Sequence, residues 1–319
     1  MSSAVEVKNL VKRYKKATKN AVNDVSFSVG EGEFFTLLGP NGAGKTTIIS
    51  ILTTTLNKTS GTVTIGGRDT ETDSNAIRDN IGVIFQAPSL DLNLTAEENI
   101  RLHASLYGLY TFMPFFSLMS EAYKKQVNTL AELVDLKDAI FVPIKTYSGG
   151  MKRKLEIIRS LMHKPSVLFL DEPTTGLDPV SRRDVWEYLH DVRKREGTTI
   201  FLTTHYLDEA EKADHVCVID DGKVLLYGTP ADMKGKLVQE YLLLDAEDRG
   251  ALARDLAPWH LRIDEASQHP MRICLDEETQ AQEIIRAISV PLSFLDIERP
   301  TLEEAYVKLI EKDHAETTV

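Results

Sequence analysis

A glycine-rich stretch, Gly39-Pro-Asn-Gly-Ala-Gly-Lys-Thr46, has the spacing G-x-x-x-x-G-K-[ST]. Glycines at these positions let backbone N–H groups turn inward and surround phosphate oxygens. The lysine then reaches the β- and γ-phosphates of a nucleotide, and the hydroxyl that follows binds Mg²⁺. The apolar strand expected at 33–38 precedes the stretch and a helical pattern follows it, whereas a chance Gly-rich turn would lack both. We therefore expect Lys45 and Thr46 to bind a nucleotide's phosphates and its metal ion.

Two adjacent carboxylates end a second apolar strand. The segment SVLFLDE, residues 166–172, is almost continuously apolar, as are strands buried in parallel sheets. Asp171 stands at its carboxyl end, where open α/β sheets bind ligands, and we expect it to hold Mg²⁺ through water. Glu172 is the candidate general base for an attacking water molecule. A solvated acidic strand end is the alternative, and the phosphate-binding stretch makes it less favoured.

Two further polar residues close strands of the same predicted sheet. Gln86 closes GVIFQ and offers an amide that can bind Mg²⁺ or orient water, and His205 closes IFLTTH and can contact the γ-phosphate. Taken alone, a Gln at a strand end is usually just exposed, and a lone His is more often structural. Because the strands of one parallel sheet end at one edge, we expect Gln86 and His205 to lie beside the phosphate-binding loop, which favours both as members of that site.

The stretch TYSGGMKRKLEI, residues 146–157, combines a helix start with positive charge. Ser148 is a good N-cap, yet Lys152, Arg153 and Lys154 crowd the first turn. A helix N-terminus carries partial positive charge and normally attracts acidic residues. We therefore expect an external anion in front of this helix. The three basic side chains themselves are better explained as a solvated basic turn than as phosphate ligands.

Strands alternate with helices along the first 230 residues, which predicts a layered α/β domain with a mainly parallel sheet. Thr95 opens a capping box with Glu98, Ser120 caps the next helix, and an Asp-Gly turn joins two strands within 215–228. The other strands expected in this part of the chain lie at 4–11, 25–29, 33–38, 62–65, 80–86, 166–172 and 198–205, and the helices at 48–56, 95–107, 120–134, from 148, and 181–194.

The character of the chain changes near residue 230. Strand, helix, strand, strand, helix and strand are expected at 241–245, 247–256, 260–266, 271–277, 279–288 and 292–298, followed by a helix at 301–312. This is the order of a ferredoxin-like split unit. Several carboxylates and one histidine here are better explained as loop and solvent-face charges than as a metal site: Asp264, Glu265, His269, Asp276 and Glu277.

Composition sets the broad class. The chain has 319 residues, 42% hydrophobic and 27% charged, with a net charge of −11, as in a globular protein rather than a nucleic-acid binder. Cys217 and Cys274 have no metal-type spacing, so two buried thiols in a reducing compartment are expected. The N-terminus lacks the apolar core of a secretory signal, and no apolar run reaches the roughly 18 residues of a membrane span.

Together these motifs resemble the ATP-binding subunit of ABC transporters, in the family's order along residues 4–230. The resemblance makes Gln86 the Q-loop glutamine, His205 the switch histidine, and Asp171 with Glu172 the second nucleotide motif. It implies that Thr46, Gln86 and Asp171 hold Mg²⁺. The residues implied to bind ATP are Tyr14, stacking on adenine, the phosphate loop Gly39, Pro40, Asn41, Gly42, Ala43, Gly44, Lys45, Thr46 and Thr47, the signature Ser148, Gly149 and Gly150, and Asp178 of the D-loop.

The resemblance also implies a fold and a partner. The fold is an α/β P-loop NTPase of ABC type, whose mainly parallel sheet core carries an antiparallel β part and a helical subdomain at about 95–165. The expected domains are 1–230, which binds nucleotide, and 231–319, a small α+β ferredoxin-like domain. In this family the signature of one subunit caps the γ-phosphate of ATP bound by the other. A second nucleotide-binding domain, expected as a homodimer, therefore supplies the anion in front of Ser148.

Three further segments resemble the daunorubicin-resistance-type, or ABC-2, exporter ATPases, namely YSGGMKRKLEI, THYLDEAE and IERPTLEEAYVKLIE. This implies a separate membrane permease, a place at the cytoplasmic face of the membrane, and a drug, lipid or polysaccharide as cargo. Met151 departs from the commoner Gln of the signature and puts its ribose or D-loop contact in doubt. The alternatives are a soluble ABC-type ATPase with a non-transport partner, which usually carries two ATP domains or a coiled-coil insertion, and a non-catalytic ATP binder.

The segment LYTFMPFFSLM, residues 109–119, has no counterpart in the usual family pattern. We refer to it as the insert. It is too short to span a bilayer. One hypothesis is that the insert docks on the permease or touches the membrane surface. The other is that it is a local plug packed over the helical subdomain.

Overall fold

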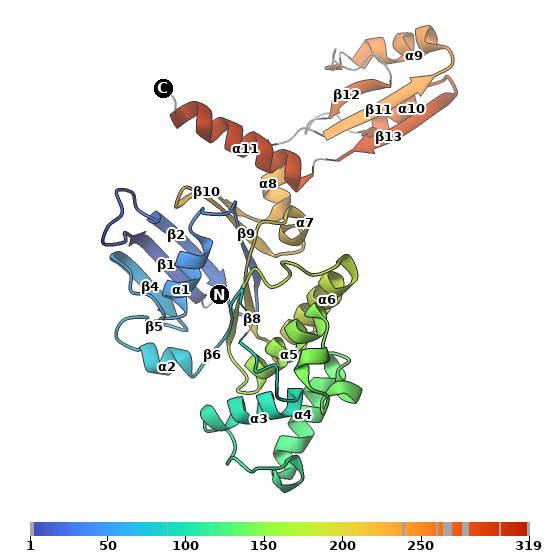
Figure 1. The fold of residues 1–319 in the computed structure, drawn as a ribbon. Helices are drawn as coiled ribbons and strands as arrows, with labels where there is room; N and C mark the ends of the chain where they lie inside the picture. The colour runs from blue at the N-terminus through green and yellow to red at the C-terminus, as the bar shows by residue number, and fades with distance from the viewer. Residues whose placement is uncertain are drawn as a thin grey trace. The chain divides into compact units, whose positions relative to one another are not determined.

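The computed structural model describes residues 3–87, 89–237, 240–259, 261–263, 270–275, 281–299 and 301–317. The chain divides into two compact units, Met1–Thr229 (unit 1) and Pro230–Val319 (unit 2). Figure 1 shows their helices and strands in chain order.

The main sheet of unit 1 has six strands in the order β10-β9-β3-β8-β7-β6. All neighbours pair in parallel except β9 and β10, which form an antiparallel hairpin at one edge. The carboxyl ends of the four strands β3, β8, β7 and β6 therefore meet at one edge, as the sequence predicted. The bounds are β3 Phe34–Leu38, β6 Ile81–Ile84, β7 Val167–Asp171, β8 Thr199–Thr204, β9 His215–Asp220 and β10 Lys223–Gly228.

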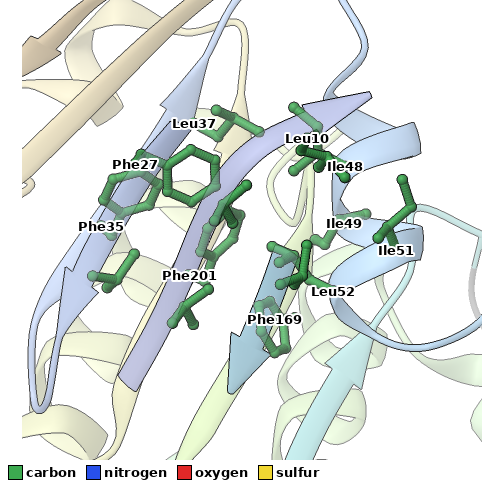
Figure 2. Packing of buried hydrophobic residues seen from close by; sticks show 14 of the residues in the cluster. Leu10, Phe27, Phe35, Leu37, Ile48, Ile49, Ile51, Leu52, Phe169 and Phe201 are labelled. Atoms are coloured by element: carbon green, nitrogen blue, oxygen red, sulfur yellow. The ribbon is translucent and has the colours of Figure 1, made fainter. Parts of the chain in front are cut away.

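A second, antiparallel sheet of four strands has the order β2-β1-β4-β5, with bounds Val22–Gly30, Ser3–Lys12, Ser60–Ile65 and Arg68–Asp69. Helix α1, Lys45–Leu52, shares one hydrophobic core with both sheets. Figure 2 shows the rings of Phe27, Phe35, Phe169 and Phe201 in this core, and the centroid of Phe35 lies 5.3 Å from that of Phe27 and 4.9 Å from that of Phe201. This core fixes the helix that follows the phosphate loop.

Three further helices of unit 1 begin at the caps that the sequence indicated, whereas the helix expected from Ser181 begins two residues earlier, at Pro179. Thr95 forms the capping box of α3, Ala96–Leu106, and Ser120 caps α4, Glu121–Leu133. Ser148 accepts a hydrogen bond from Met151 N and caps α5, Gly149–Leu161. Helix α6, Pro179–Glu196, begins after Asp178 and ends at Gly197, whose φ is 68°. The shorter helices are α2 Ser74–Arg78 and α7 Leu207–Ala210.

Several boundaries differ from the sequence-based expectation. Helix α1 begins at Lys45 rather than at residue 48 and ends at Leu52, where the Thr53 hydroxyl bonds to the carbonyl of Ile49 and closes the last turn. Strand β6 ends at Ile84 and β8 at Thr204, so Gln86 and His205 stand just beyond their strands rather than in them. Helices α2 and α7 were not predicted, because four or five residues carry no readable periodicity.

Unit 2 contains a three-stranded antiparallel sheet in the order β12-β11-β13. The strand expected at 260–266 appears among the described residues only as an antiparallel bridge between Ile263 and Ile273 of β12, so three of the four strands of the ferredoxin-like order are formed there. The five charged residues considered as a metal site lie outside the described residues. The bounds are α8 Pro230–Leu237, β11 Glu240–Ala246, α9 Arg249–Leu256, β12 Met271–Leu275, α10 Ala281–Ala287, β13 Leu292–Glu298 and α11 Leu302–Thr317.

Some side chains of the insert pack against the helical subdomain, whereas others are exposed. The Tyr110 hydroxyl donates to Gln126, the ring of Phe116 lies 5.1 Å from that of Phe141, and Met119 is buried, so these three side chains form the plug. Phe112, Phe115 and Leu118 are 53%, 65% and 57% exposed. The insert is therefore anchored on one side and presents apolar surface on the other.

The structure also tests the expectations for the two cysteines and for membrane-spanning helices. Both cysteines are free, and Cys217 is buried, but Cys274 is only half-buried, contrary to expectation. Within the part of the chain that the structure describes, no helix is both long and apolar enough to span a bilayer.

Candidate functional site

The phosphate loop needs glycine for steric reasons. Gly44 has φ 107°, in the left-handed region, and a Cβ there would lie 2.7 Å from the carbonyl oxygen of Ala21. At Gly39 a Cβ would lie 2.3 Å from the carbonyl oxygen of Ile219. Side chains at either position would push the loop away from the sheet. The glycines thus let the loop wrap closely over the start of α1.

Lys45 is buried beneath the loop. Its Nζ donates to the carbonyl oxygens of Gly39 at 2.8 Å and Pro40 at 3.1 Å, and it lies 3.2 Å from Glu172 Oε1. A lysine held in this way presents a fixed positive charge to the interior of the loop. This is the charge that a β- or γ-phosphate would contact.

The Glu172 carboxylate stands between two basic side chains. Lys45 approaches Oε1, and His205 Nδ1 lies 3.4 Å from Oε2. Burial raises the pKa of the Glu172 carboxyl, but the hydrogen bond and charge of Lys45, followed by His205 and the Thr175 hydroxyl, outweigh it and lower the pKa below its usual value. The group is therefore an ionised proton acceptor at neutral pH.

Asp171 lies directly before Glu172 and is only 2% exposed. Thr203 Oγ1 donates to its Oδ1 at 2.6 Å. With the hydroxyl of Thr46 and the amide of Gln86, the available donors are all oxygens, which is the set that Mg²⁺ prefers. Among the described residues, no three His, Cys, Asp or Glu side chains form a group that could hold a metal ion. An ion here would thus share its coordination with phosphate oxygens and water, as Mg²⁺ commonly does.

A cavity of about 590 Å³ is lined by Lys45, Thr46, Gln86, Glu172 and His205, whereas Asp171 does not line it. The structure thus brings together most of the predicted phosphate loop with Gln86, Glu172 and His205. Tyr14 stands beside the loop, with its hydroxyl 3.3 Å from Thr47 Oγ1 and its ring 46% exposed. The cavity is lined by Ala21, Asn41, Gly42, Gly44, Lys45, Thr46, Thr47, Gln86, Glu172, Thr175 and His205.

Sequence reasoning missed two of the lining residues. Thr175 donates its hydroxyl to Glu172 Oε2 at 3.2 Å, and its signal was its position three residues after that carboxylate. Ala21 carries no chemical signal, since its side chain is a methyl group and its proximity to Gly44 depends on the fold.

The signature and the D-loop residue do not line this cavity. Ser148 is exposed at the N-terminus of α5. Asp178 accepts hydrogen bonds from Val180 N, Ser181 N and Ser181 Oγ, and those from Ser181 above all lower the pKa of its carboxyl. Asp178 therefore caps α6, and any contact with nucleotide would be additional to that role.

The basic turn of α5 is not simply solvated, contrary to expectation. Arg153 is 6% exposed and donates to Glu156 at 2.9 Å and to the carbonyl oxygens of Phe85, Asp171 and Pro173. Its charge is neutralised inside the protein rather than by water, which the sequence could not show because the partners come from three separate segments. Lys154 lies 3.4 Å from Asp184.

A glycine loop between a buried strand and a helix, facing the Glu172 carboxylate at the carboxyl edge of a parallel sheet, defines the class of P-loop nucleotide-binding proteins. Residues 22–175 match the family model described as "ABC transporter". The chain is 32% identical over 318 residues to the daunorubicin resistance ATP-binding protein DrrA3 of Streptomyces coeruleorubidus, covering 98% of this chain and 97% of that protein.

Other relatives agree with this match. A Nod factor export ATP-binding protein I of Burkholderia orbicola is 36% identical and covers 79% of this chain and 80% of its own. A solved dimeric post-hydrolysis state of the ATP-binding cassette MJ0796, bound to ADP and Pi, superimposes with a TM-score of 0.62 at 27% identity, over 70% of this chain and 98% of that one. The chain belongs to the ATP-binding subunits of ABC transporters, which are ATPases, and the predicted fold class is confirmed.

Proposed function

We propose that this chain is the ATP-hydrolysing subunit of a membrane exporter. The main support for ATP hydrolysis is the position of the Glu172 carboxylate, which lies between Lys45 and His205 in the lining of the phosphate-loop cavity. In this proposal residues 1–230 are the nucleotide-binding domain, with its helical subdomain at about 95–165. Residues 231–319 are a separate small domain.

Each site residue has a role that fits its surroundings. Lys45 and the loop's N–H groups bind phosphate, Glu172 accepts a proton from water, and His205 holds the γ-phosphate. Tyr14 stacks on adenine at the open side of the cavity. Thr46, Gln86 and Asp171 are the proposed Mg²⁺ ligands, and the ion when bound supplies positive charge against the phosphates.

The exporter assignment is supported by the relatives. The two relatives of similar sequence described above are named for daunorubicin resistance and for Nod factor export. By analogy the chain acts with a separate permease at the cytoplasmic face of the membrane, and its cargo is a drug, a lipid or a polysaccharide. ATP binding and hydrolysis would close and reopen the ATPase pair, and the segment Gln86–Leu94 would pass the movement to the permease.

A second copy of this chain is the proposed partner at the signature. Ser148, Gly149 and Gly150 begin a helix whose first turn has no acidic residue and which does not face the cavity of its own chain. The γ-phosphate of ATP on a neighbouring copy would supply the missing anion. One solved relative in the family is described as dimeric, which supports the pairing.

The test is the purified Glu172→Gln variant. It should bind ATP with nearly unchanged affinity but turn over about 10²–10⁴-fold more slowly, because it loses a general base. Glu187→Gln, on the exposed face of α6, is the matched control and should keep the parental rate. Near-normal turnover in Glu172→Gln would remove Glu172 from its proposed role.

The mass of Glu172→Gln in solution, with and without ATP and Mg²⁺, tests the pairing. A monomer that becomes a dimer only with ATP supports a signature that serves a neighbour's phosphate. A dimer that forms without ATP would place the contact elsewhere, in residues 231–319 or in the insert. A monomer under all conditions would contradict self-pairing and point to a different ATPase or to the permease.

A further inference from the structure

Two consecutive threonines end strand β8, and their hydroxyls serve different partners. Successive side chains of a strand point to opposite faces of the sheet. The Thr204 hydroxyl donates to Glu209 Oε2 at 2.6 Å and accepts from Tyr206 N, so it fixes the loop that follows β8. Thr203 points instead toward β7 and the acidic pair at its end.

Thr203 uses both hydrogen-bonding capacities of its hydroxyl on that pair. Its Oγ1 donates to Asp171 Oδ1 at 2.6 Å and accepts from Glu172 N at 3.0 Å. Its carbonyl oxygen also accepts from Glu172 N, at 3.1 Å. The Thr203 side chain is completely buried, so water does not compete for these bonds.

Both targets need such a contact. Glu172 has φ 47°, in the left-handed region, and a non-glycine residue stays there only when its surroundings hold it. Asp171 is a buried carboxylate, and its orientation depends on donors inside the protein. One hydroxyl therefore constrains the direction of the first carboxylate and the backbone turn that aims the second toward Lys45 and His205.

We propose that Thr203 is a positioning residue for ATP hydrolysis, acting through Asp171 and Glu172. The proposal rests on the roles assigned to these two carboxylates above. Without the hydroxyl, Asp171 can rotate away from the metal position, and the Glu172 N–H loses one of its two hydrogen bonds. Phosphate binding by Lys45 and the glycine loop does not pass through Thr203, so nucleotide affinity in the absence of metal stays unaffected.

The test uses four variants of the full chain. Thr203→Val keeps the branched shape and removes the hydroxyl, and Thr203→Ser keeps the hydroxyl. Thr203→Ala differs from Thr203→Ser only by the hydroxyl, so this pair answers the question even if Thr203→Val fails to fold. Thr36→Val is the control, because Thr36 is equally buried on the neighbouring strand β3 and its hydroxyl has no partner among the described residues.

We expect Thr203→Val and Thr203→Ala to lower kcat about 10- to 100-fold, as for a lost hydrogen bond to a charged group, with KM for ATP changed by less than about threefold. Thr203→Ser and Thr36→Val should stay within about threefold of the parent in kcat. A second measurement is ATP affinity by calorimetry, in Mg²⁺ and in EDTA. The gain in affinity that Mg²⁺ gives should shrink in Thr203→Val and return in Thr203→Ser.

Two results would overturn the proposal. A Thr203→Val protein with parental kcat and parental Mg²⁺ dependence would show that the hydroxyl positions nothing. Equal losses in Thr203→Ser and Thr203→Ala would assign the effect to packing of the methyl group. Failure of the proposed function itself is separate, since it would appear as normal turnover in Glu172→Gln measured in the same assay.

Discussion

Gly149 and Gly150 are adjacent in the signature, yet the structure gives them different constraints. A Cβ at Gly150 would lie 2.6 Å from Ser181 Oγ, and Ser181 is itself tied to Asp178. A Cβ at Gly149 would meet only Leu177 at 3.4 Å, an ordinary contact. The packing of α5 against α6 thus requires glycine at position 150, whether or not this residue contacts phosphate. No close contact among the described residues requires glycine at position 149, so contact with a ligand remains as the reason for glycine there.

Alanine at the two positions should therefore separate folding from pairing. Gly150→Ala should lower the free energy of unfolding by about 1–3 kcal/mol, the usual effect of overpacking. Gly149→Ala should leave stability within about 1 kcal/mol, because alanine is well tolerated in helices. Its methyl group should nevertheless weaken the ATP-dependent dimer of the Glu172→Gln background. Thermal melting and solution mass measure the two effects, and an unweakened dimer in Gly149→Ala would argue against phosphate binding at the signature.

At the scale of elements, local signals predicted local structure well. The caps at Thr95, Ser120 and Ser148 begin helices where expected, and the alternation of apolar strands with helices gave the mainly parallel sheet. These features depend on a few neighbouring residues, so the sequence displays them directly. Boundaries were less certain, as at α1, because Gly44 and Thr53 set its ends through contacts outside the helical periodicity.

Contacts between elements were beyond sequence reasoning. Most of the residues that line the cavity could be named from motifs, but Ala21 and Thr175 of its lining could not, nor could Thr203 and Arg153. Arg153 looked like part of a basic turn, although its guanidinium joins α5 to carbonyl oxygens at the ends of β6 and β7. Nothing in the spacing of KRK shows which side chain turns inward. Such links depend on the three-dimensional meeting of segments that are far apart in the chain.

The insert yields a prediction at the same scale, because its aromatic residues fall into two groups. Phe112→Ser with Phe115→Ser removes two exposed rings, of which Phe112 lies 5.6 Å from the Arg101 guanidinium, and should lower the free energy of unfolding by no more than about 1 kcal/mol. Phe116→Ser removes ring contacts with Phe141 and Tyr123 and should cost about 1–2 kcal/mol. If the exposed rings dock on the permease or the membrane, only the double variant should lose assembly at near-parental stability.

The measurement is co-purification with the permease in membranes, together with thermal melting of each variant. Unchanged assembly in the double variant would leave the insert as a plug of the helical subdomain. Loss of assembly in Phe116→Ser alone would assign the defect to unfolding of the plug, since that ring is partly covered in the isolated chain.

At the scale of the whole molecule, the groups proposed to bind and hydrolyse ATP all lie in unit 1. Every residue of the cavity, and the signature, precedes residue 230. Unit 2 has a hydrophobic core of its own, built around Leu242, Leu244 and Ile273 of the sheet with Leu252 of α9 and Ile284 of α10. We propose that this unit serves the pairing of two copies or its regulation, because none of the described residues proposed to bind ATP belongs to it.

A chain ending at Thr229 tests this division of labour. It should bind ATP with the affinity of the full chain, because the cavity and its supporting core are complete without unit 2. In the Glu172→Gln background its ATP-dependent dimer should be weaker by about tenfold or more, which corresponds to the loss of roughly 1.4 kcal/mol of contact energy. Calorimetry and sedimentation measure the two quantities, and the ATPase rate of the truncated parent gives a third. Intact dimerisation together with an intact rate would exclude both a pairing and a regulatory role, and unit 2 would then have to act on the permease.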